Sequence, residues 1–328
     1  MTFSALVLDQ TEDGVVATVQ RLDDERLPDG DVTVKVEHSS LNYKDAMILK
    51  SIGRLVREYP HVPGVDLAGA VETSASDRFA PGDRVVLTGF RVGETWWGGF
   101  ATRACLKADW LVRLPDSLST RDAMAVGTAG FTAMLAVDAL ERHGLAPGAG
   151  PVVVTGAAGG LGSFAVHLLA RRGHEAVAST RRAATHDYLT ALGASSVVDA
   201  GELAEPTARP LLSERWAGCV DAVGGSTLAH VLAELRYGAA LAACGNTAGN
   251  DITMNVLPLI LRGVDVLGIE SVMCPIDVRE RVWAAVADTV ERGALADMTT
   301  DASLADLPGL ADEMLAGRVR GRVVVQTG

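Results

Sequence analysis

The sequence is poor in residues that bind metals or cross-link a chain. It contains four cysteines and seven histidines among 328 residues. The cysteines lie far apart without a C-x-x-C pair, and the histidines show no metal-ligand spacing, so we expect no structural or catalytic zinc. Scattered cysteines are typical of reduced thiols in the cytosol. The cysteines are Cys105, Cys219, Cys244 and Cys274.

An excess of positive charge and an apolar leader are also missing. The formal net charge is −12, with 29 Lys and Arg against 41 Asp and Glu, whereas a nucleic-acid partner requires a basic face. The first ten residues contain no basic residue, and Asp9 interrupts their apolar run, so we expect neither a signal peptide nor a membrane span. The sequence therefore predicts a cytoplasmic protein with no nucleic-acid or membrane partner.

The apolar runs divide the chain into three parts, and its length is enough for two domains. Residues 1–120 contain short apolar runs separated by turn residues, which is typical of an antiparallel, barrel-like β domain. Residues 121–270 alternate helix with strand and predict a doubly wound α/β sheet. Residues 271–328 contain a helix and a last strand, 322–325, which we expect to return to the first domain. The strands expected in the second part lie at 152–155, 175–179, 196–198, 219–223, 239–244 and 264–269.

Two helices of the second part are expected from local signals. An apolar helix begins at Thr120 and ends near Gly144. Another helix follows the turn Gly224–Gly225 and runs to Arg236. Because ligands of a doubly wound sheet bind beyond the carboxyl ends of its strands, we expect the turns at 156–162, 221–225 and 245–250 to line a cofactor cleft.

The segment 151–173 combines a strand, a glycine turn and a helix, as a dinucleotide site requires. Val152–Thr155 form a β-branched run, and three glycines follow with the spacing G-x-x-G-x-x-G. Such glycines allow a tight turn and a close approach of the backbone to a pyrophosphate at the helix N-terminus. The alternative is a glycine-rich turn in another kind of α/β protein. The predicted cofactor-binding residues of this loop are Gly156, Ala158, Gly159, Gly160, Leu161 and Gly162.

The end of the second strand predicts which dinucleotide binds. An NAD site would carry Asp or Glu about 20 residues beyond the glycine turn, for the ribose 2′-hydroxyl. This chain instead has Ser179, Thr180, Arg181 and Arg182, and guanidinium groups suit a 2′-phosphate because charge-assisted hydrogen bonds are strong. We therefore predict NADPH as the cofactor. The alternative is a solvated basic helix start.

Four further motifs stand in the chain, namely S-S-L-N-Y-K-D at 39–45, P-G-V-D-L-A-G at 63–69, G-D-R-V at 82–85 and G-T-A-G-F-T-A at 127–133. Together with the glycine turn, these motifs resemble the zinc-free medium-chain dehydrogenase/reductase superfamily. This resemblance implies a GroES-like β-barrel catalytic domain and a Rossmann NADPH-binding domain. The segment 258–272 is similar to the acrylyl-CoA reductase group, whose members are also named quinone oxidoreductases. Arg181 departs from the family pattern, which often has Gly there, and Asn246–Thr247 replace more apolar residues.

The resemblance implies an activity that needs no metal. Zinc-dependent relatives carry a Cys near the position of Asn42 and a His-Glu pair near Val65–Asp66, and this chain has neither. An activated C=C bond needs no Lewis acid, because the conjugated carbonyl accepts the charge. The expected reaction transfers hydride from C4 of NADPH to the β-carbon of a short 2-enoyl-CoA, such as acryloyl-CoA, giving propionyl-CoA. The alternatives are an NADPH:quinone or general enone and enal reductase, and a non-catalytic dinucleotide-binding protein.

The resemblance also suggests roles for single residues. Tyr43 either donates a hydrogen bond to the thioester oxygen, contacts the nicotinamide or only packs in the cleft wall. Asn42 is expected to orient the substrate or the cofactor amide, while Asp45 is expected to cap a short helix and Asp66 to be structural. Arg262 either reaches a phosphate or ends a helix. The residues expected to complete the NADPH site, with Tyr43, are Cys244, Gly245, Ile260, Ser271 and Arg318.

Two further expectations concern partners. By family analogy, the strand at 264–269 is an exposed sheet edge through which two copies of the chain form a homodimer. The substrate is a small molecule, and no cluster in the sequence stands out as the binding place for CoA phosphates.

Overall fold

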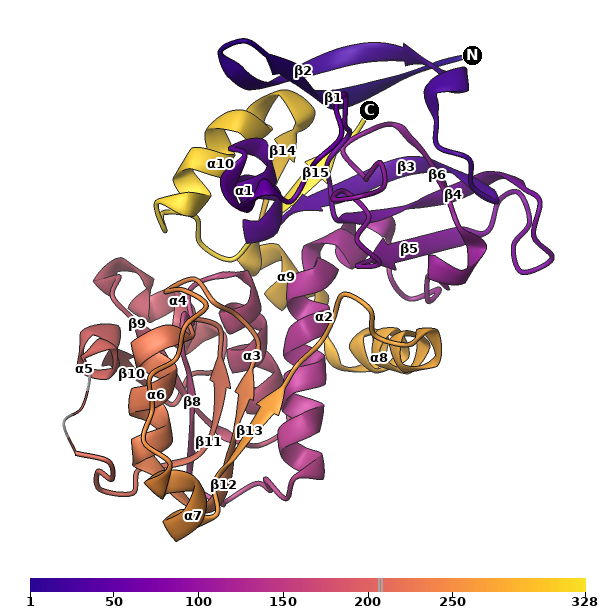
Figure 1. Ribbon diagram of the computed structural model, residues 1–328. Helices are drawn as coiled ribbons and strands as arrows, with labels where there is room; N and C mark the ends of the chain where they lie inside the picture. The colour runs from indigo at the N-terminus through magenta and orange to yellow at the C-terminus, as the bar shows by residue number, and fades with distance from the viewer. Residues whose placement is uncertain (206, 208) are drawn as a thin grey trace. The chain divides into compact units, whose positions relative to one another are not determined.

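The computed structural model describes residues 1–328 except 206 and 208 (Figure 1). It divides the chain into two compact units, which we call unit 1 (Met1–Thr128 with Ser271–Gly328) and unit 2 (Ala129–Glu270). The sequence had placed the first boundary between residues 120 and 121. The units instead divide inside helix α2 (Thr120–Arg142), shortly after a break in that helix.

Unit 2 contains a six-stranded parallel sheet with the order β10-β9-β8-β11-β12-β13. This order reverses direction at β8, as in the doubly wound dinucleotide fold, and confirms the predicted fold. The strands are β8 (Pro151–Val154), β9 (Glu175–Thr180), β10 (Ser196–Asp199), β11 (Trp216–Asp221), β12 (Leu235–Ala243) and β13 (Asp265–Gly268). The helices besides α2 are α3 (Gly160–Arg171), α4 (His186–Ala191), α5 (Ala200–Ala204), α6 (Gly225–Glu234) and α7 (Leu257–Arg262), with a 3-10 turn at Ala183–Thr185.

Burial explains why the strands of unit 2 are apolar throughout. Val152, Val153 and Val154 are fully buried, because both faces of a parallel sheet are covered. On one face, helix α6 packs Leu228 and Val231 against this core. The helix predicted to reach Arg236 ends at Glu234, since β12 already begins at Leu235, earlier than the predicted residue 239.

Unit 1 contains an antiparallel pair, β1 (Thr2–Thr11) and β2 (Gly14–Asp23), and a seven-stranded sheet. The last strand of the chain returns to this sheet, as predicted: β15 pairs antiparallel with β3 and parallel with β14, and Figure 1 shows β15 in yellow beside the indigo β3. The strand order is β14 (Thr299–Ser303), β15 (Arg322–Gln326), β3 (Val32–Leu41), β4 (Asp66–Ser74), β5 (Arg84–Thr88) and β7 (Val112–Arg113), with β6 (Arg103–Leu106) paired to β3.

The helices of unit 1 connect and cover these strands. They are α1 (Tyr43–Leu49), α8 (Ile276–Thr289), α9 (Arg292–Met298) and α10 (Leu307–Leu315), with 3-10 turns at Asp24–Arg26, Ile52–Arg54, Ala108–Trp110 and Leu304–Asp306. Helix α10 lies against α1, and together with β1, β3 and β15 they enclose a core that includes Leu41, Ile48 and Leu307.

Helix α2 is the longest helix among the described residues and lies where the sequence predicts one. By length and composition alone it is the one helix of the described chain that is apolar enough to cross a membrane, but 78% of its apolar window is buried, as is usual for a core helix. The helix predicted from Thr120 to near Gly144 is confirmed, and Gly127, with φ 51° and ψ −159°, breaks it. Residues with a side chain rarely adopt this backbone conformation, so the break depends on glycine.

Candidate functional site

The loop of Gly156–Gly162, here called the glycine loop, connects β8 to α3 with little space for side chains. Gly156 has φ +60°, and a Cβ added to Gly162 would lie 2.3 Å from the Gly156 carbonyl oxygen. Helix α3 begins at Gly160 with no capping side chain, so the N–H groups of its first turn are free for an anion. The loop therefore fits a pyrophosphate, as the sequence predicts.

A buried carboxylate joins two strand ends beside the glycine loop. Asp221, at the end of β11, accepts hydrogen bonds from Thr155 Oγ1 (2.5 Å) and from the Gly224 N–H (2.8 Å). A Cβ added to Gly245 would lie 2.4 Å from the Ala222 carbonyl oxygen, so the predicted turns after β11 and β12 lie in contact. Burial raises the pKa of Asp221. Burial, and then the charge of Asp221, raise the pKa of the Cys244 thiol, which therefore stays protonated at neutral pH.

The end of β9 presents hydroxyl and guanidinium groups to the glycine loop. Arg182 Nη2 donates a hydrogen bond to the Ala158 carbonyl oxygen (3.1 Å), and the Arg182 N–H donates to Thr180 Oγ1 (3.1 Å). Ser179 Oγ is buried and has no hydrogen-bond partner among the described residues, so it can bind a ligand group. Arg181 is exposed. None of residues 179–182 is a carboxylate. Their hydroxyl and guanidinium groups fit a dinucleotide with a 2′-phosphate better than one with a ribose 2′-hydroxyl.

A second polar cluster lies entirely in unit 1, and we call it the Arg322 network. Arg322 is only 2% exposed and donates hydrogen bonds to Asn42 Oδ1 (3.0 Å) and Ser40 Oγ (2.8 Å). Its Nη2 lies 3.9 Å from the carboxylate of the fully buried Asp66. Burial lowers the pKa of Arg322, and the Asp66 and Asp45 carboxylates oppose this shift. The network consists of Ser40, Asn42, Asp45, Asp66, Thr128 and Arg322.

Asp66 attaches the helix break of α2 to the sheet of unit 1. Its carboxylate accepts hydrogen bonds from the Thr128 N–H (2.8 Å) and Thr128 Oγ1 (2.5 Å). Arg322 Nε donates to the carbonyl oxygen of Ala125 (3.0 Å), on the other side of the break. A Cβ added to Gly127 would lie 2.5 Å from Arg322 Nη2 and 2.6 Å from Asp66 Oδ2. The break is therefore fixed from both sides, and the structural role predicted for Asp66 agrees with these contacts.

Asn42 and Asp45 fix the start of α1. Asn42 is the N-cap residue, and its N–H donates to Asp45 Oδ2 (2.9 Å) in a capping box. Asp45 thus caps the helix, although from the third helical position rather than the N-cap position that the sequence suggested. Asp45 also accepts from the Val65 N–H (2.9 Å). Burial, and then the Asp66 carboxylate, raise the pKa of Asp45 to about 7. Both polar atoms of the Asn42 amide are bonded to buried groups, which favours a positioning role.

Tyr43 is the first residue of α1 and differs from its neighbours in being accessible. Its side chain is 36% exposed, and its hydroxyl has no hydrogen bond to any residue that the structure describes. The Asn42–Asp45 capping box fixes the backbone on which this ring stands. The hydroxyl is therefore available to donate a hydrogen bond to a ligand.

Four other predicted residues lie outside these clusters. Ile260 is 65% exposed on α7, which leads into the start of β13 and so lies at the amino ends of the strands, opposite the glycine loop. Arg262 donates to the carbonyl oxygens of Ala233 (2.8 Å) and Leu235 (3.1 Å), which favours its structural alternative. Ser271 and Arg318 belong to unit 1, where Arg318 forms a bidentate ion pair with Glu313.

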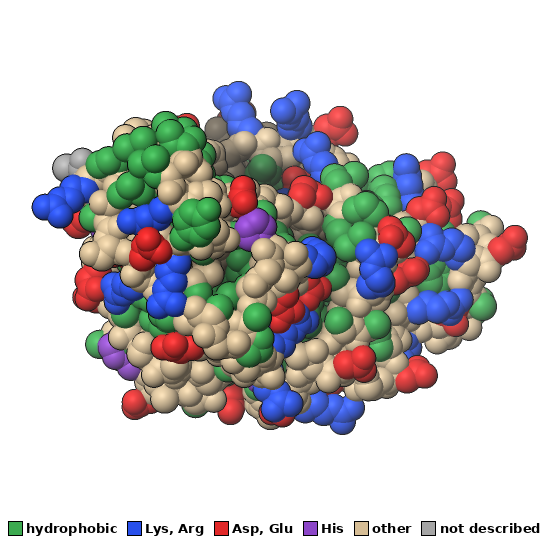
Figure 2. Space-filling model, turned by 90° about the horizontal axis from the view of Figure 1, so that it is seen from below, with side chains coloured by type: hydrophobic (Ala, Val, Ile, Leu, Met, Phe, Trp, Pro, Cys, Tyr) green, Lys and Arg blue, Asp and Glu red, His purple; other side chains and the backbone are tan. Residues whose placement is uncertain are grey.

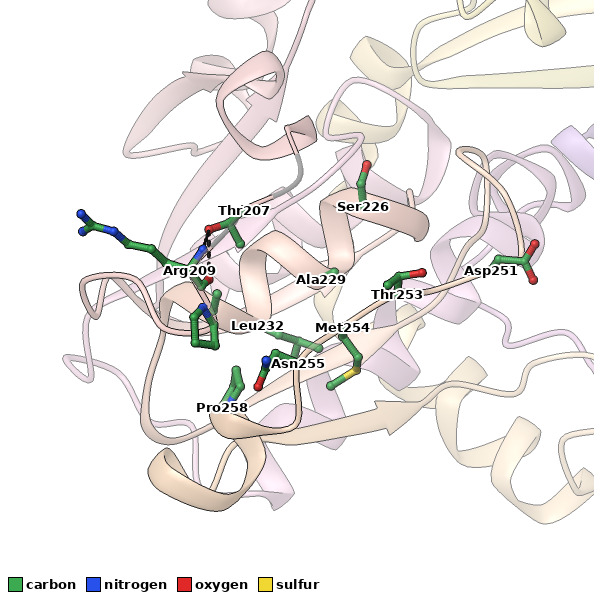
Figure 3. Close-up of a pocket in the computed structure, with 12 residues that line it drawn as sticks. Thr207, Arg209, Ser226, Ala229, Leu232, Asp251, Thr253, Met254, Asn255 and Pro258 are labelled. Carbon is green, nitrogen blue, oxygen red and sulfur yellow. Dashed lines mark hydrogen bonds between the residues drawn. The ribbon is translucent and has the colours of Figure 1, made fainter.

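A cavity of unit 2 is separate from all these residues. It has a volume of ≈ 410 Å³ and lies along helix α6 between two segments of unit 2. Figure 3 shows Ser226 and Leu232 on the helix, with Thr253 and Met254 on the neighbouring segment. No predicted site residue lines this cavity.

Sequence reasoning missed several residues of the site. Thr155, Ser40, Thr128 and Arg322 were not among the predicted site residues, although their hydrogen bonds organise both clusters. Arg322 carried one signal, since this arginine directly precedes three valines in the predicted last strand. A charge in such a place requires buried partners.

The comparisons with known proteins agree with this architecture. Residues 28–116 match the alcohol dehydrogenase GroES-like domain, and residues 160–288 match the zinc-binding dehydrogenase family. Although the second description names zinc, the described residues include no group of three His, Cys, Asp or Glu side chains placed to hold a metal ion.

Individual relatives match over nearly the whole chain. Acrylyl-CoA reductase AcuI of Ruegeria pomeroyi is 55% identical over 98% of this chain and 98% of that protein. The YhdH oxidoreductase of Salmonella enterica, solved in complex with NADP, is 47% identical with a TM-score of 0.96 and covers 99% of both chains. The YhfP protein of Bacillus subtilis, solved with NAD bound, is 42% identical with a TM-score of 0.95, again over 99% of both chains.

Proposed function

This chain belongs to the medium-chain dehydrogenase/reductase superfamily, and on that premise we propose that it reduces the C=C bond of a short 2-enoyl-CoA with NADPH. Acryloyl-CoA is the expected substrate and propionyl-CoA the product, without zinc. The observation that carries the proposal is the 55% identity, over 98% of both chains, to a protein named acrylyl-CoA reductase. The proposal includes a cytoplasmic location, which the four free cysteines support.

In this proposal the residues of unit 2 hold the cofactor. NADPH, when bound, supplies the hydride that the β-carbon of the substrate accepts. The N–H groups at the start of α3 bind its pyrophosphate. Ser179, Thr180 and Arg182 bind the 2′-phosphate, because they place two hydroxyls and a guanidinium at the end of β9. The buried Asp221 positions the turns after β11 and β12 beside them.

Tyr43 of unit 1 acts on the substrate. When the β-carbon accepts hydride, negative charge develops on the thioester oxygen until the α-carbon takes up a proton. A hydrogen-bond donor at that oxygen stabilises the transition state. The Tyr43 hydroxyl is the accessible donor at the start of α1, and the Arg322 network fixes the backbone below it. Asn42 is a positioning residue in this scheme.

A comparison of substrates tests the proposed function. The absorbance of NADPH is followed at fixed enzyme concentration with acryloyl-CoA, crotonyl-CoA and a benzoquinone in parallel, and each reaction is repeated with NADH. We expect acryloyl-CoA with NADPH to be the fastest pair. Faster oxidation by the quinone would favour the alternative of a quinone or enone reductase. Cofactor binding without turnover of any alkene would indicate a non-catalytic protein.

Arg182→Ala should change the cofactor preference. Loss of one charge-assisted bond to the 2′-phosphate should lower kcat/KM for NADPH about 10- to 100-fold, while the value for NADH stays nearly unchanged. Steady-state kinetics with both cofactors measure this ratio. Arg142→Ala is the matched control, because this exposed arginine of unit 2 ends α2, away from the glycine loop and the end of β9, and its loss should leave both values unchanged. An equal loss with NADPH and NADH would mean that Arg182 only supports the glycine loop through Ala158.

We also propose a homodimer that pairs through β13. This strand is the edge of the sheet and is bonded to β12 on one side only, which leaves backbone groups for a second copy. Exposed apolar residues stand on it and on α7, namely Val266, Ile260 and Leu261. Figure 1 shows α7 at the lower end of unit 2, and Figure 2, seen from below, shows hydrophobic side chains gathered in a patch.

Light scattering tests the proposed dimer. At micromolar concentration the parent protein should have the mass of a dimer, and the Val266→Lys variant should have the mass of a monomer. A monomeric parent protein would contradict the proposal.

A further inference from the structure

One cationic pair of unit 1 has no part in the site described so far. Lys44, next to Tyr43, forms an ion pair with Glu94 Oε1 (2.8 Å), and Arg91 Nε lies 3.6 Å from Glu94 Oε2. Glu94 is only 7% exposed, whereas Arg91 is 53% exposed and Lys44 is partly exposed. Two cations thus share one buried carboxylate. A net positive charge remains at the surface in a chain whose formal charge is −12.

The backbone that carries Arg91 is strained. Gly89, Phe90 and Arg91 have φ values of +87°, +51° and +58°, so three consecutive residues are left-handed. The described residues other than glycine with positive φ are Ser51, Arg54, Phe90 and Arg91. Ser51 and Arg54 lie in the turn after α1, and Arg91 is joined to α1 through Glu94 and Lys44. Strain that is concentrated around one element is characteristic of ligand clamps and active sites.

The buried Arg279 fixes this turn. Its guanidinium donates to the carbonyl oxygens of Thr88 (2.5 Å), Ser271 (2.6 Å) and Val272 (2.8 Å) and lies 4.4 Å from the centre of the Phe90 ring. The Phe90 N–H donates to the Val272 carbonyl oxygen (2.7 Å), and the Phe90 ring stacks on Trp110. The guanidinium of Arg91 therefore projects from a rigid support. Such a support lowers the entropy lost when a ligand binds.

We infer that Lys44 and Arg91 bind a phosphate group of the CoA part of the substrate. This inference rests on the proposed function, because it names the residues that would bind the phosphates of the proposed CoA thioester substrate. CoA carries several negative charges on phosphates, and an acidic protein binds such a ligand only where cations are concentrated locally. Lys44 follows Tyr43 directly in α1, and Arg91 is joined to Lys44 through Glu94.

Binding of free CoA tests this inference independently of turnover. Calorimetric titrations with CoA are made with the nucleotide site saturated by NADP⁺, so that CoA cannot bind at Arg182. Arg91→Gln is the first variant, because the 2.8 Å pair of Lys44 with Glu94 remains; Lys44→Gln is the second. We expect each to raise the Kd for CoA about tenfold, as the loss of one charge-assisted contact does. Arg281→Gln, which removes an exposed cation of α8 in unit 1, is the control and should leave Kd unchanged.

Kinetics with a phosphate-free substrate supply the second measurement. S-acryloyl-N-acetylcysteamine has the same enoyl thioester without phosphates. The two variants should raise KM for acryloyl-CoA about tenfold but leave KM for this analogue unchanged. Equal effects on both substrates, unchanged CoA binding in the variants, or no CoA binding by the parent protein would each overturn the inference. If the parent protein binds CoA through these residues but reduces neither thioester, the inference stands and the proposed function fails.

Discussion

Tyr43→Phe should lower kcat for acryloyl-CoA about 10²–10³-fold, as the loss of one donor at a developing oxyanion does. The substitution keeps the ring and removes only the hydroxyl, which makes no hydrogen bond to the described residues. Because the negative charge on the thioester oxygen exists in the transition state and not in the bound substrate, KM should change little. Stopped-flow or steady-state oxidation of NADPH measures both parameters.

The control for this experiment is Tyr237→Phe. Tyr237 is exposed on β12 of unit 2, and loss of its hydroxyl should leave kcat unchanged. A Tyr43→Phe enzyme with full kcat would exclude the hydroxyl as a required donor. A raised KM with unchanged kcat would instead indicate that Tyr43 contributes only to binding, which was one of the alternatives left open by the sequence.

Arg322→Ala should destabilise unit 1 by about 3–5 kcal/mol, the usual cost of removing one partner of a buried ion pair. The variant leaves the carboxylate of Asp66 buried without its cation and removes hydrogen bonds to Ser40, Asn42 and the carbonyl oxygen of Ala125. Urea unfolding followed by tryptophan fluorescence is a suitable measurement, because Trp96, Trp97, Trp110 and Trp283 lie in unit 1 and Trp216 in unit 2. The transition of unit 1 should occur at a lower urea concentration.

Two further variants test whether loss of the buried positive charge of Arg322 causes the destabilisation. Arg281→Ala, an exposed arginine of the same unit, should leave the transition unchanged. Asp66→Asn combined with Arg322→Ala should be less destabilised than the sum of the single variants, because the buried carboxylate no longer lacks a cation. An unchanged transition in Arg322→Ala would show that the network does not stabilise the fold.

The sequence alone was sufficient for the strands of unit 2, and it predicted the residues that we propose for the nucleotide. Apolar periodicity indicates the strand at Val152–Val154. Turn geometry explains the glycines at 156, 159 and 162, and local charge explains the phosphate role predicted for Arg182. These properties extend over a few neighbouring residues, so a reader of the sequence can recognise them without knowing the fold. Family similarity also suggested Ile260, and only the fold shows that α7 places this residue at the amino ends of the strands.

Only the tertiary structure shows the contacts between residues that are far apart in the chain. β15 lies beside β3, which places Arg322 against Asn42, 280 residues away, and commits both polar atoms of that amide to buried partners. The break at Gly127 is fixed by Asp66 and Arg322, and Lys44 shares Glu94 with Arg91. No local pattern specifies these contacts, because strand order and the cost of burying an unpaired charge determine which distant groups must meet.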